Sequence, residues 1–230
     1  MFGDNPVRKQ ELRDDDRLWV QEVFYTLQGE GPFAGQPAVF VRLAGCNLRC
    51  FWCDTDFESS TWLPELHALL REIDERRPAH CDLVVITGGE PFRQNIAPLV
   101  RILLLRGLRV QIETAGTLWL DIPEDDHLFI VCSPKTPELN AEIERRIHAY
   151  KYVIADGETD EHDGLPTMAT QVRGKRSHIA RPRPGAAVYV MPRDDRDDAT
   201  NRANLRTCAR IARQWGYRMT VQLHKLAGLP

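Results

Sequence analysis

Short apolar segments alternate with segments of helical apolar spacing along most of this chain. Residues 83–87 form a continuous apolar run typical of a buried strand, whereas residues 61–77 have the spacing of an amphipathic helix, with Thr61 as its expected N-cap. Such alternation implies right-handed crossovers and a parallel sheet. We expect further strands at 37–43, 108–114, 128–132, 150–154, 187–191 and 218–223, and further helices at 96–106 and 199–215.

The length of 230 residues suits one α/β domain with a sizeable core. We expect residues 1–19 to be a charged, weakly ordered lead-in to a single domain over residues 20–230. Residues 156–185 interrupt the alternation with charges, glycines and prolines, so we expect a long, mobile loop excursion there and not a second domain. Because polar motifs directly follow several strands, we expect an α/β fold of the incomplete, open β/α barrel type.

Composition excludes some classes of function. A formal net charge of −3 argues against a general nucleic-acid binder, and the basic residues at 173–176 and 181–183 are expected to be solvated. The chain begins without an apolar signal region, and no segment approaches the ~18 apolar residues of a membrane span. We therefore expect a protein of the reducing cytoplasm, with no membrane partner.

Three cysteines with C-x3-C-x2-C spacing occur close together: Cys46, Cys50 and Cys53. Structural zinc sites are usually closed by four ligands, and cubane iron–sulfur clusters usually take four cysteines. A cubane held by three thiolates keeps one iron open for a small molecule. A zinc-bound interaction module without catalysis is the alternative from a different class. The remaining cysteines are scattered and expected to pack as small hydrophobes: Cys81, Cys132 and Cys208.

Polar motifs also follow the expected strands. Residues 87–91 read Thr-Gly-Gly-Glu-Pro, in which glycines let backbone amides approach a ligand and Glu90 offers a carboxylate to an ammonium group. Residues 113–116 and 133–135 repeat the arrangement. The guanidinium of Arg42 suits a carboxylate or a carbonyl, although an end-of-strand arginine paired with an acid is the structural alternative.

The cysteine loop, with the aromatic Trp52 before its third cysteine, resembles that of the radical S-adenosylmethionine (SAM) enzymes. Between Thr26 and Thr55 the chain carries LQGEG upstream of the loop and CDT at its end, and this combination resembles the 7-carboxy-7-deazaguanine synthases. The resemblance continues through 87–91, 113–116, 133–135 and 222–225. A glycyl-radical-enzyme activating protein shares the cysteine loop and is the enzymatic alternative, but it has no reason to carry LQGEG.

The resemblance implies a lyase that converts 6-carboxy-5,6,7,8-tetrahydropterin to 7-carboxy-7-deazaguanine with loss of ammonia, in queuosine-type 7-deazapurine biosynthesis. It implies that Cys46, Cys50 and Cys53 ligate a [4Fe-4S] cluster and that Thr55 binds Mg²⁺. A reductase or flavodoxin-type electron donor and a homodimer are also implied. Residues implied to contact SAM are Trp52, Cys53, Asp54, Gly89, Glu90, Ser133, Pro134, Lys135, Met191, Pro192, Arg193 and Asp194. Those implied to hold the pterin are Leu27, Gln28, Gly29, Glu30, Arg42, Thr87, His224 and Pro230.

Two of these assignments have particular features. Met191 stands where many relatives have a glutamine, so a side-chain hydrogen bond to the cofactor ribose is in doubt while backbone contact stays open. Pro230 corresponds to a terminal proline whose α-carboxylate enters the site in some relatives. Such a carboxylate, ionised at neutral pH, can accept two hydrogen bonds from the guanidine-like edge of a pterin.

Overall fold

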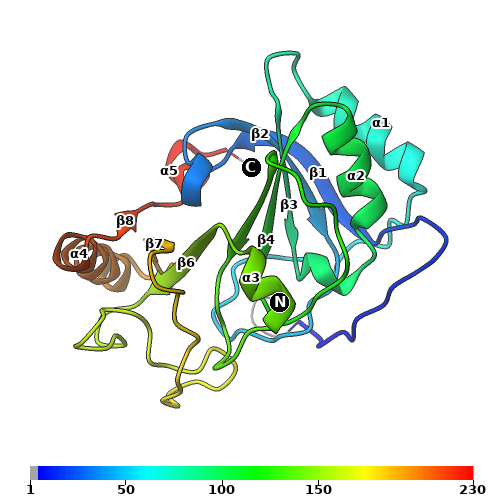
Figure 1. The fold of residues 1–230 in the computed structure, drawn as a ribbon. Coiled ribbons are helices and arrows are strands. Elements are labelled where there is room, and N and C mark those ends of the chain that lie inside the picture. The colour runs from blue at the N-terminus through cyan, green and yellow to red at the C-terminus, as the bar shows by residue number, and fades with distance from the viewer. Residues whose placement is uncertain (1–4, 230) are drawn as a thin grey trace.

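The computed structural model describes residues 5–229, which contain one eight-stranded sheet in sequential strand order (Figure 1). Strand β1 pairs with β2 in antiparallel fashion, and β2 to β8 are parallel. Because β1 and β8 are the two edges, the expected open β/α barrel is confirmed. The strands are β1 Val20–Leu27, β2 Pro37–Leu43, β3 Leu83–Gly88, β4 Arg109–Thr114, β5 Leu128–Cys132, β6 Ala149–Ile154, β7 Ala187–Pro192 and β8 Arg218–Met219.

Helices cover the outer face of the sheet in two groups. The α1 and α2 helices pack beside β1 to β4, and α4 packs against β6, β7 and β8 (Figure 1). Helix α4 has caps at both ends, because the Asp197 side chain accepts from Thr200 N and Gly216 adopts φ 72°. The helices are α1 Leu66–Arg76, α2 Ala97–Leu105, α3 Ala141–Arg146, α4 Asp198–Trp215 and α5 Leu223–Ala227, with 3-10 turns η1 Gly31–Phe33 and η2 Pro91–Arg93.

Two boundaries predicted from the sequence were wrong. Thr61 does not cap α1, which begins only after Glu65. Pro64 disfavours a helical conformation in the residue before it, and the preceding segment pairs with β1 through Val20 N and the carbonyl of Trp62 at 2.9 Å. The expected strand at 218–223 stops at Met219, and its last expected residue, Leu223, begins α5. Strand β1 and helix α3 were not predicted.

The inner face of the sheet is divided into an apolar and a polar half. Strand residues near the amino ends of the parallel strands, such as Ala38, Leu83 and Val85, form a small buried cluster with Phe33 of η1. The ring of Phe33 meets that of Phe129 edge to face at 4.8 Å between centroids. Polar side chains occupy the carboxyl half of the same face, so the apolar cluster forms the floor beneath the site.

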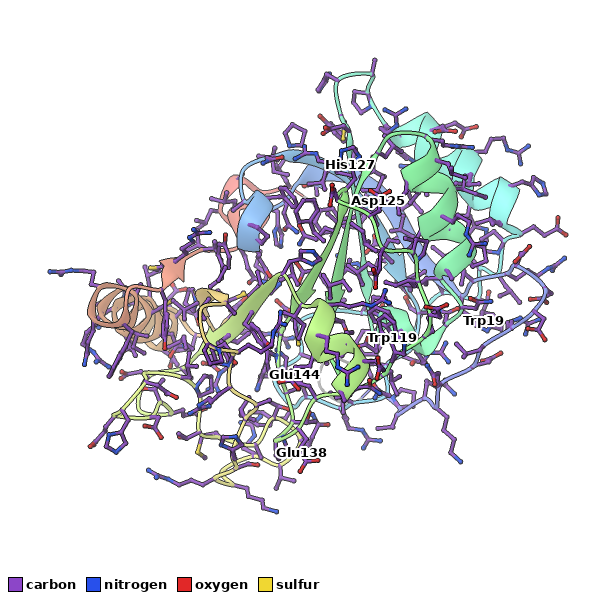
Figure 2. The ribbon with its side chains drawn as sticks, in the orientation of Figure 1. Trp19, Trp119, Asp125, His127, Glu138 and Glu144 are labelled. Carbon is purple, nitrogen blue, oxygen red and sulfur yellow. The ribbon has the colours of Figure 1, made fainter. Side chains whose placement is uncertain are left out.

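The lead-in lies along the carboxyl end of the sheet, beside the cysteine loop. Residues 5–19 contain no helix or named strand, but Arg8 N donates to the carbonyl of Cys46 at 2.7 Å and Glu11 N to that of Arg93 at 2.7 Å. In Figure 2 this segment passes near Trp119, whose carbonyl accepts from Gln10 Nε2 at 2.9 Å. These bonds connect the lead-in to the motifs that follow β2 and β3.

Residues 156–185 connect β6 to β7 without a helix or a named strand. Two isolated bridges, Thr159 with Pro166 and Met168 with Arg176, shape the excursion into two hairpin-like turns. The second turn reaches the cysteine loop, where Thr170 O accepts from Phe51 N at 3.0 Å. None of the described helices is both long and apolar enough to cross a bilayer.

Candidate active site

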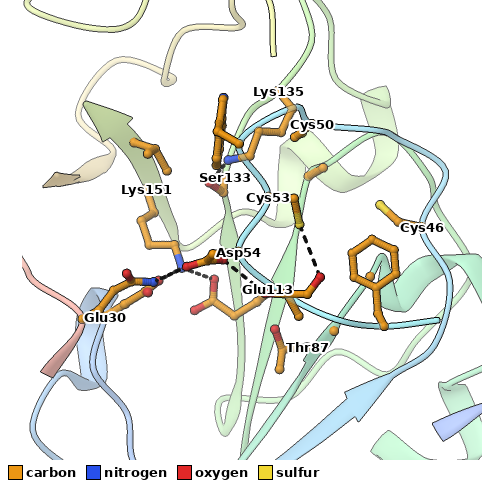
Figure 3. A pocket seen from close by; sticks show the side chains of 18 of the residues that line it. Glu30, Cys46, Cys50, Cys53, Asp54, Thr87, Glu113, Ser133, Lys135 and Lys151 are labelled. Carbon is orange, nitrogen blue, oxygen red and sulfur yellow. Dashed lines mark hydrogen bonds and ion pairs between the residues drawn. The ribbon is translucent and has the colours of Figure 1, made fainter. Parts of the chain in front are cut away.

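A cavity of about 410 Å³ opens at the carboxyl end of the parallel strands (Figure 3). Its size is that of a pocket for small molecules. The sequence-predicted site residues that line it are Gln28, Glu30, Arg42, Cys46, Cys50, Trp52, Cys53, Asp54, Thr55, Thr87, Gly89, Ser133, Lys135, Met191, Pro192, Arg193, Asp194 and His224. Those that do not line it are Leu27, Gly29, Glu90 and Pro134. Pro230 lies outside the described residues.

The three clustered cysteines lie on the loop after β2 and face this cavity. Burial, followed by the charge of Glu90, raises the pKa of Cys46 to about 12, so its thiolate requires a compensating cation such as iron. Among residues 5–229, no three His, Cys, Asp or Glu side chains converge on a point suitable for one metal ion. The three cysteines line the same cavity, and each thiolate of a cubane binds a different iron, so this donor set fits a cluster that keeps one iron open.

The glycines after β3 bring that strand end against the cysteine loop. A Cβ at Gly89 would lie 2.0 Å from the carbonyl oxygen of Gly45, so only glycine fits. Glu90 N then donates to the same oxygen at 3.0 Å. The Glu90 carboxylate is buried and accepts from Thr114 Oγ1 at 2.7 Å and Ala115 N at 2.8 Å. It therefore fixes the loop after β4, contrary to the expectation that it faces the cavity.

The loop after β5 contributes a buried cation to the cavity wall. Lys135 Nζ donates to Ser133 Oγ at 2.5 Å and lies 5.0 Å from the ring centroid of Trp52. Burial lowers the pKa of Lys135. The ring of Trp52 and the hydroxyl of Ser133 thus hold this ammonium beside Cys50, where a polar cofactor could contact it.

A buried ion triad crosses the inner face of the sheet (Figure 3). Lys151 Nζ lies 2.5 Å from Glu30 Oε2 and 2.7 Å from Glu113 Oε2. Burial raises the pKa of Glu113, whereas Lys151 lowers that of Glu30 against the opposing effect of burial. Glu113 is therefore the carboxylate that more readily carries a proton. Sequence reasoning did not assign Lys151, although a lone lysine in the apolar β6 was a usable signal.

The LQGEG segment reaches the cavity by an indirect path. Because β1 is antiparallel to β2, Leu27 lies beside Pro37, at the end of β2 remote from the cysteines. The chain then folds back so that Gln28 and Glu30 line the cavity. Gln28 Oε1 accepts from Glu30 N at 3.0 Å, which stabilises this return.

Arg42 pairs with an acid and also borders the cavity. It lines the cavity, and its Nε lies 2.7 Å from Glu22 Oε1 in an ion pair that is partly exposed. The guanidinium also lies 5.3 Å from the ring centroid of Phe24. A structural pairing with an acid is present, and the remaining guanidinium face is available to a ligand.

Helix α5 connects the cysteine loop to the end of β7. Lys225 Nζ donates to Asp54 Oδ2 at 2.7 Å and to Asp194 Oδ2 at 2.8 Å, and Gln222 Nε2 donates to Asp54 at 3.0 Å. The hydrogen bond from Lys225 lowers the pKa of Asp194 to about 2. The pKa of Asp54 is also lowered, because Lys225 outweighs the opposing effect of burial. The Gln-Leu-His-Lys segment therefore closes one side of the cavity.

We expect Gly29→Ala to raise the KM for substrate about tenfold, because the added Cβ would displace a segment that contacts the substrate. A displacement of 1 Å can cost about 100-fold, so a tenfold loss corresponds to a smaller shift. A Cβ at Gly29 would lie 2.9 Å from His224 Nδ1 and 2.9 Å from Leu223 N, so α5 must move. Steady-state kinetics on cluster-matched samples would measure the change. An unchanged KM in Gly29→Ala would show that the position of α5 does not matter.

Comparisons with known proteins agree with this site. The sequence model of the Radical SAM superfamily matches residues 41–130. A 7-carboxy-7-deazaguanine synthase of Rhodospirillum rubrum is 60% identical over 98% of each chain, and one of Rickettsia prowazekii is 36% identical over 100% of this chain and 96% of that protein. The crystal structure of QueE from Escherichia coli has the same fold, with a TM-score of 0.65, 24% identity and coverage of 90% of this chain and 94% of that chain.

These similarities bear on the alternatives left open by the cysteine spacing. The matches to the synthases extend over 98% and 100% of this chain. They give no support to a zinc-bound interaction module or to a glycyl-radical-enzyme activating protein. The chain therefore belongs to the 7-carboxy-7-deazaguanine synthase family of the radical SAM superfamily.

Proposed function

We propose that this chain is a carbon–nitrogen lyase that converts 6-carboxy-5,6,7,8-tetrahydropterin to 7-carboxy-7-deazaguanine with release of ammonia. The observation that carries the proposal is the 60% identity to a 7-carboxy-7-deazaguanine synthase over 98% of the chain. The cavity supports it, because the cysteine loop and the LQGEG segment face the same space. The product would serve queuosine-type 7-deazapurine biosynthesis.

Cys46, Cys50 and Cys53 would hold the [4Fe-4S] cluster, and that cluster with SAM would supply the radical that starts the reaction. The chain itself binds and orients. Asp54 is ionised, and its oxygens can accept from a cofactor ammonium or hydroxyl group. The lysine beside Trp52, Lys135, can donate to a cofactor carboxylate. The backbone of residues 191–194 would complete the cofactor site.

The pterin would lie deeper, between the LQGEG segment and α5. Gln28 and Glu30 offer an acceptor and a charge for its guanidine-like edge, while Arg42 suits its carboxylate or carbonyl. Thr87 and His224 line the same space. Leu27 and Gly29 would act through the backbone and by close packing, and the α-carboxylate of Pro230 would approach the guanidine-like edge.

Thr55 would contribute the one protein ligand to Mg²⁺, with substrate and water oxygens completing the shell. Mg²⁺ would neutralise and position the substrate carboxylate. Thr55 lines the cavity, and its hydroxyl donates to Asp54 Oδ1 in a long hydrogen bond of 3.3 Å. It can therefore turn toward a cation at little cost.

We expect Thr55→Ala to raise the Mg²⁺ concentration needed for half-maximal activity about tenfold, because a single hydroxyl ligand is a modest part of the shell. Titration of activity with Mg²⁺ would measure this, with iron and sulfide content as the control. Thr55→Ser keeps the hydroxyl and should restore the wild-type requirement. An unchanged requirement in Thr55→Ala would remove this residue from the Mg²⁺ site.

Turnover needs an electron from outside the chain. We assign this role to a reductase or flavodoxin-type donor in a reducing cytoplasm, where thiolate ligands remain unoxidised. A homodimer is the assembly that the family resemblance favours. Sedimentation of the cluster-loaded protein would measure the assembly.

Anaerobic incubation of the reconstituted protein with the carboxypterin, SAM, reductant and Mg²⁺ tests the proposed function. Mass spectrometry should detect 7-carboxy-7-deazaguanine, and omission of SAM or substrate should abolish it. A fully loaded protein that forms no such product, but introduces a radical into a second protein, would favour the activating-protein alternative.

A further inference from the structure

We propose that Gln171, in the excursion between β6 and β7, is a positioning residue that holds the Cys50 ligand and raises the reduction potential of the cluster. The inference rests on the proposed cluster site. Gln171 lies 121 residues from Cys50 in sequence, yet its Nε2 donates to Cys50 Sγ at 3.4 Å. No family motif in the sequence pointed to this residue.

The amide of Gln171 contacts two neighbouring groups of the cysteine loop at once. Its Oε1 accepts from Arg49 N at 2.6 Å while its Nε2 reaches the sulfur of Cys50. These opposed contacts fix the orientation of the amide, because reversing its oxygen and nitrogen would lose both. The nitrogen is therefore the group that faces the sulfur.

The backbone beneath this side chain is also fixed to the cysteine loop. Thr170 O accepts from Phe51 N at 3.0 Å, directly after Cys50. Thr170 is buried, and its hydroxyl donates to the carbonyl of Lys135 at 3.1 Å. The guanidinium of Arg173 covers the Phe51 ring, 4.9 Å from its centroid. Consecutive residues of the excursion thus bind the residues on both sides of Cys50.

The turn that carries Gln171 is closed by its own pairing. Met168 bridges to Arg176, and Ala169 N donates to the carbonyl of Lys175 at 2.8 Å. Because this turn is already closed, little backbone entropy is lost when Gln171 contacts the cysteine loop. We call this turn, residues 168–176, the clamp, because it holds the cysteine loop through these contacts.

A hydrogen bond from an N–H group to a ligand sulfur stabilises the reduced and the oxidised cluster to different extents. The reduced cluster places more negative charge on its sulfurs, so the hydrogen bond from Gln171 stabilises that state more and raises the potential. Gln171→Ala should therefore lower the midpoint potential. At a fixed applied potential we expect about a tenfold fall in the ratio of reduced to oxidised cluster, which is about 59 mV for one electron.

The experiment is an anaerobic redox titration of cluster-loaded Gln171→Ala, followed by electron paramagnetic resonance. Gln171→Glu keeps an acceptor for Arg49 N, but its ionised carboxylate cannot donate to Cys50 Sγ or to Thr170 Oγ1, and its charge further lowers the potential. We expect a lowered potential in both variants, and faster iron release to a chelator in Gln171→Ala than in Gln171→Glu. Gln214→Ala is the control, since Gln214 is an exposed amide on α4 that contacts Arg210.

The outcomes separate this inference from the proposed function. A wild-type protein without a [4Fe-4S] signal would reject the cluster site itself. Normal loading with the same potential in wild type and Gln171→Ala would overturn the role of Gln171 and leave the site intact. If Gln171→Ala only slowed cluster loading and left the reduction potential unchanged, the role of Gln171 would likewise be purely structural.

Discussion

Replacement of any one of Cys46, Cys50 or Cys53 with alanine is expected to abolish cluster-dependent turnover. Loss of one thiolate exposes a second iron of the cubane and destabilises it. The three side chains line one cavity, and the raised pKa of Cys46 means that its thiolate would be stabilised by an iron cation. We expect activity below detection and loss of the anaerobic absorbance of the thiolate-to-iron bands.

The other three cysteines provide matched controls. Cys81, Cys132 and Cys208 are buried and lie outside the cavity lining. Their replacement with alanine should cost about 1 kcal/mol of unfolding free energy, which is typical for a single substitution. Cys208 on α4 is the preferred control. Cys132 is less suitable, because its Sγ lies next to Gly116 in the motif that follows β4. Equal loss of cluster in both sets of variants would contradict the ligand assignment.

Lys151→Met is expected to lower the free energy of unfolding by about 3–5 kcal/mol, the usual result of breaking a buried ion pair from one side. The side chain of Lys151 is 9% exposed, and the two carboxylates that flank it are 15% and 11% exposed. Without the ammonium, Glu30 and Glu113 would repel each other in a poorly solvated site. Anaerobic urea unfolding of the cluster-loaded protein would measure the loss.

The loss should depend on pH in a defined direction. Without Lys151, the pKa values of both carboxylates in the folded state should rise above the unfolded value of about 4.3. The variant should therefore be closest to wild type near pH 4.5 and lose unfolding free energy as the pH rises toward 8. Adding Glu113→Gln removes one carboxylate and should recover part of the loss at pH 8. A pH-independent deficit that Glu113→Gln does not reduce would contradict the charge explanation.

Much of the sheet could be predicted because its strands are apolar on both faces near the floor of the barrel. The runs at Leu83–Gly88 and Leu128–Cys132 were located closely by this property. Polar residues follow these strands at once, and parallel pairing brings them to one edge of the sheet. Thr87 and Ser133 consequently line the same cavity as the cysteine loop.

Features that depend on long-range folding were missed. The return of the chain after β1 is fixed by contacts with α5 and Lys151, which no local pattern encodes. Helix α5 is too short to show helical periodicity, and the preceding β8 is an edge strand of two residues. The clamp at Thr170 and Gln171 consists of hydrogen bonds between segments more than 100 residues apart, so the charges and prolines around it suggested only a loop.

The most direct test of the central claim is the balance of the complete reaction. Reconstituted wild-type protein would be incubated anaerobically with 6-carboxy-5,6,7,8-tetrahydropterin, SAM, reductant and Mg²⁺, and the product, ammonia and remaining SAM would be quantified together. We expect equal amounts of 7-carboxy-7-deazaguanine and ammonia. A protein with iron and sulfide near four per chain that consumes SAM but forms neither product in these proportions would contradict this claim.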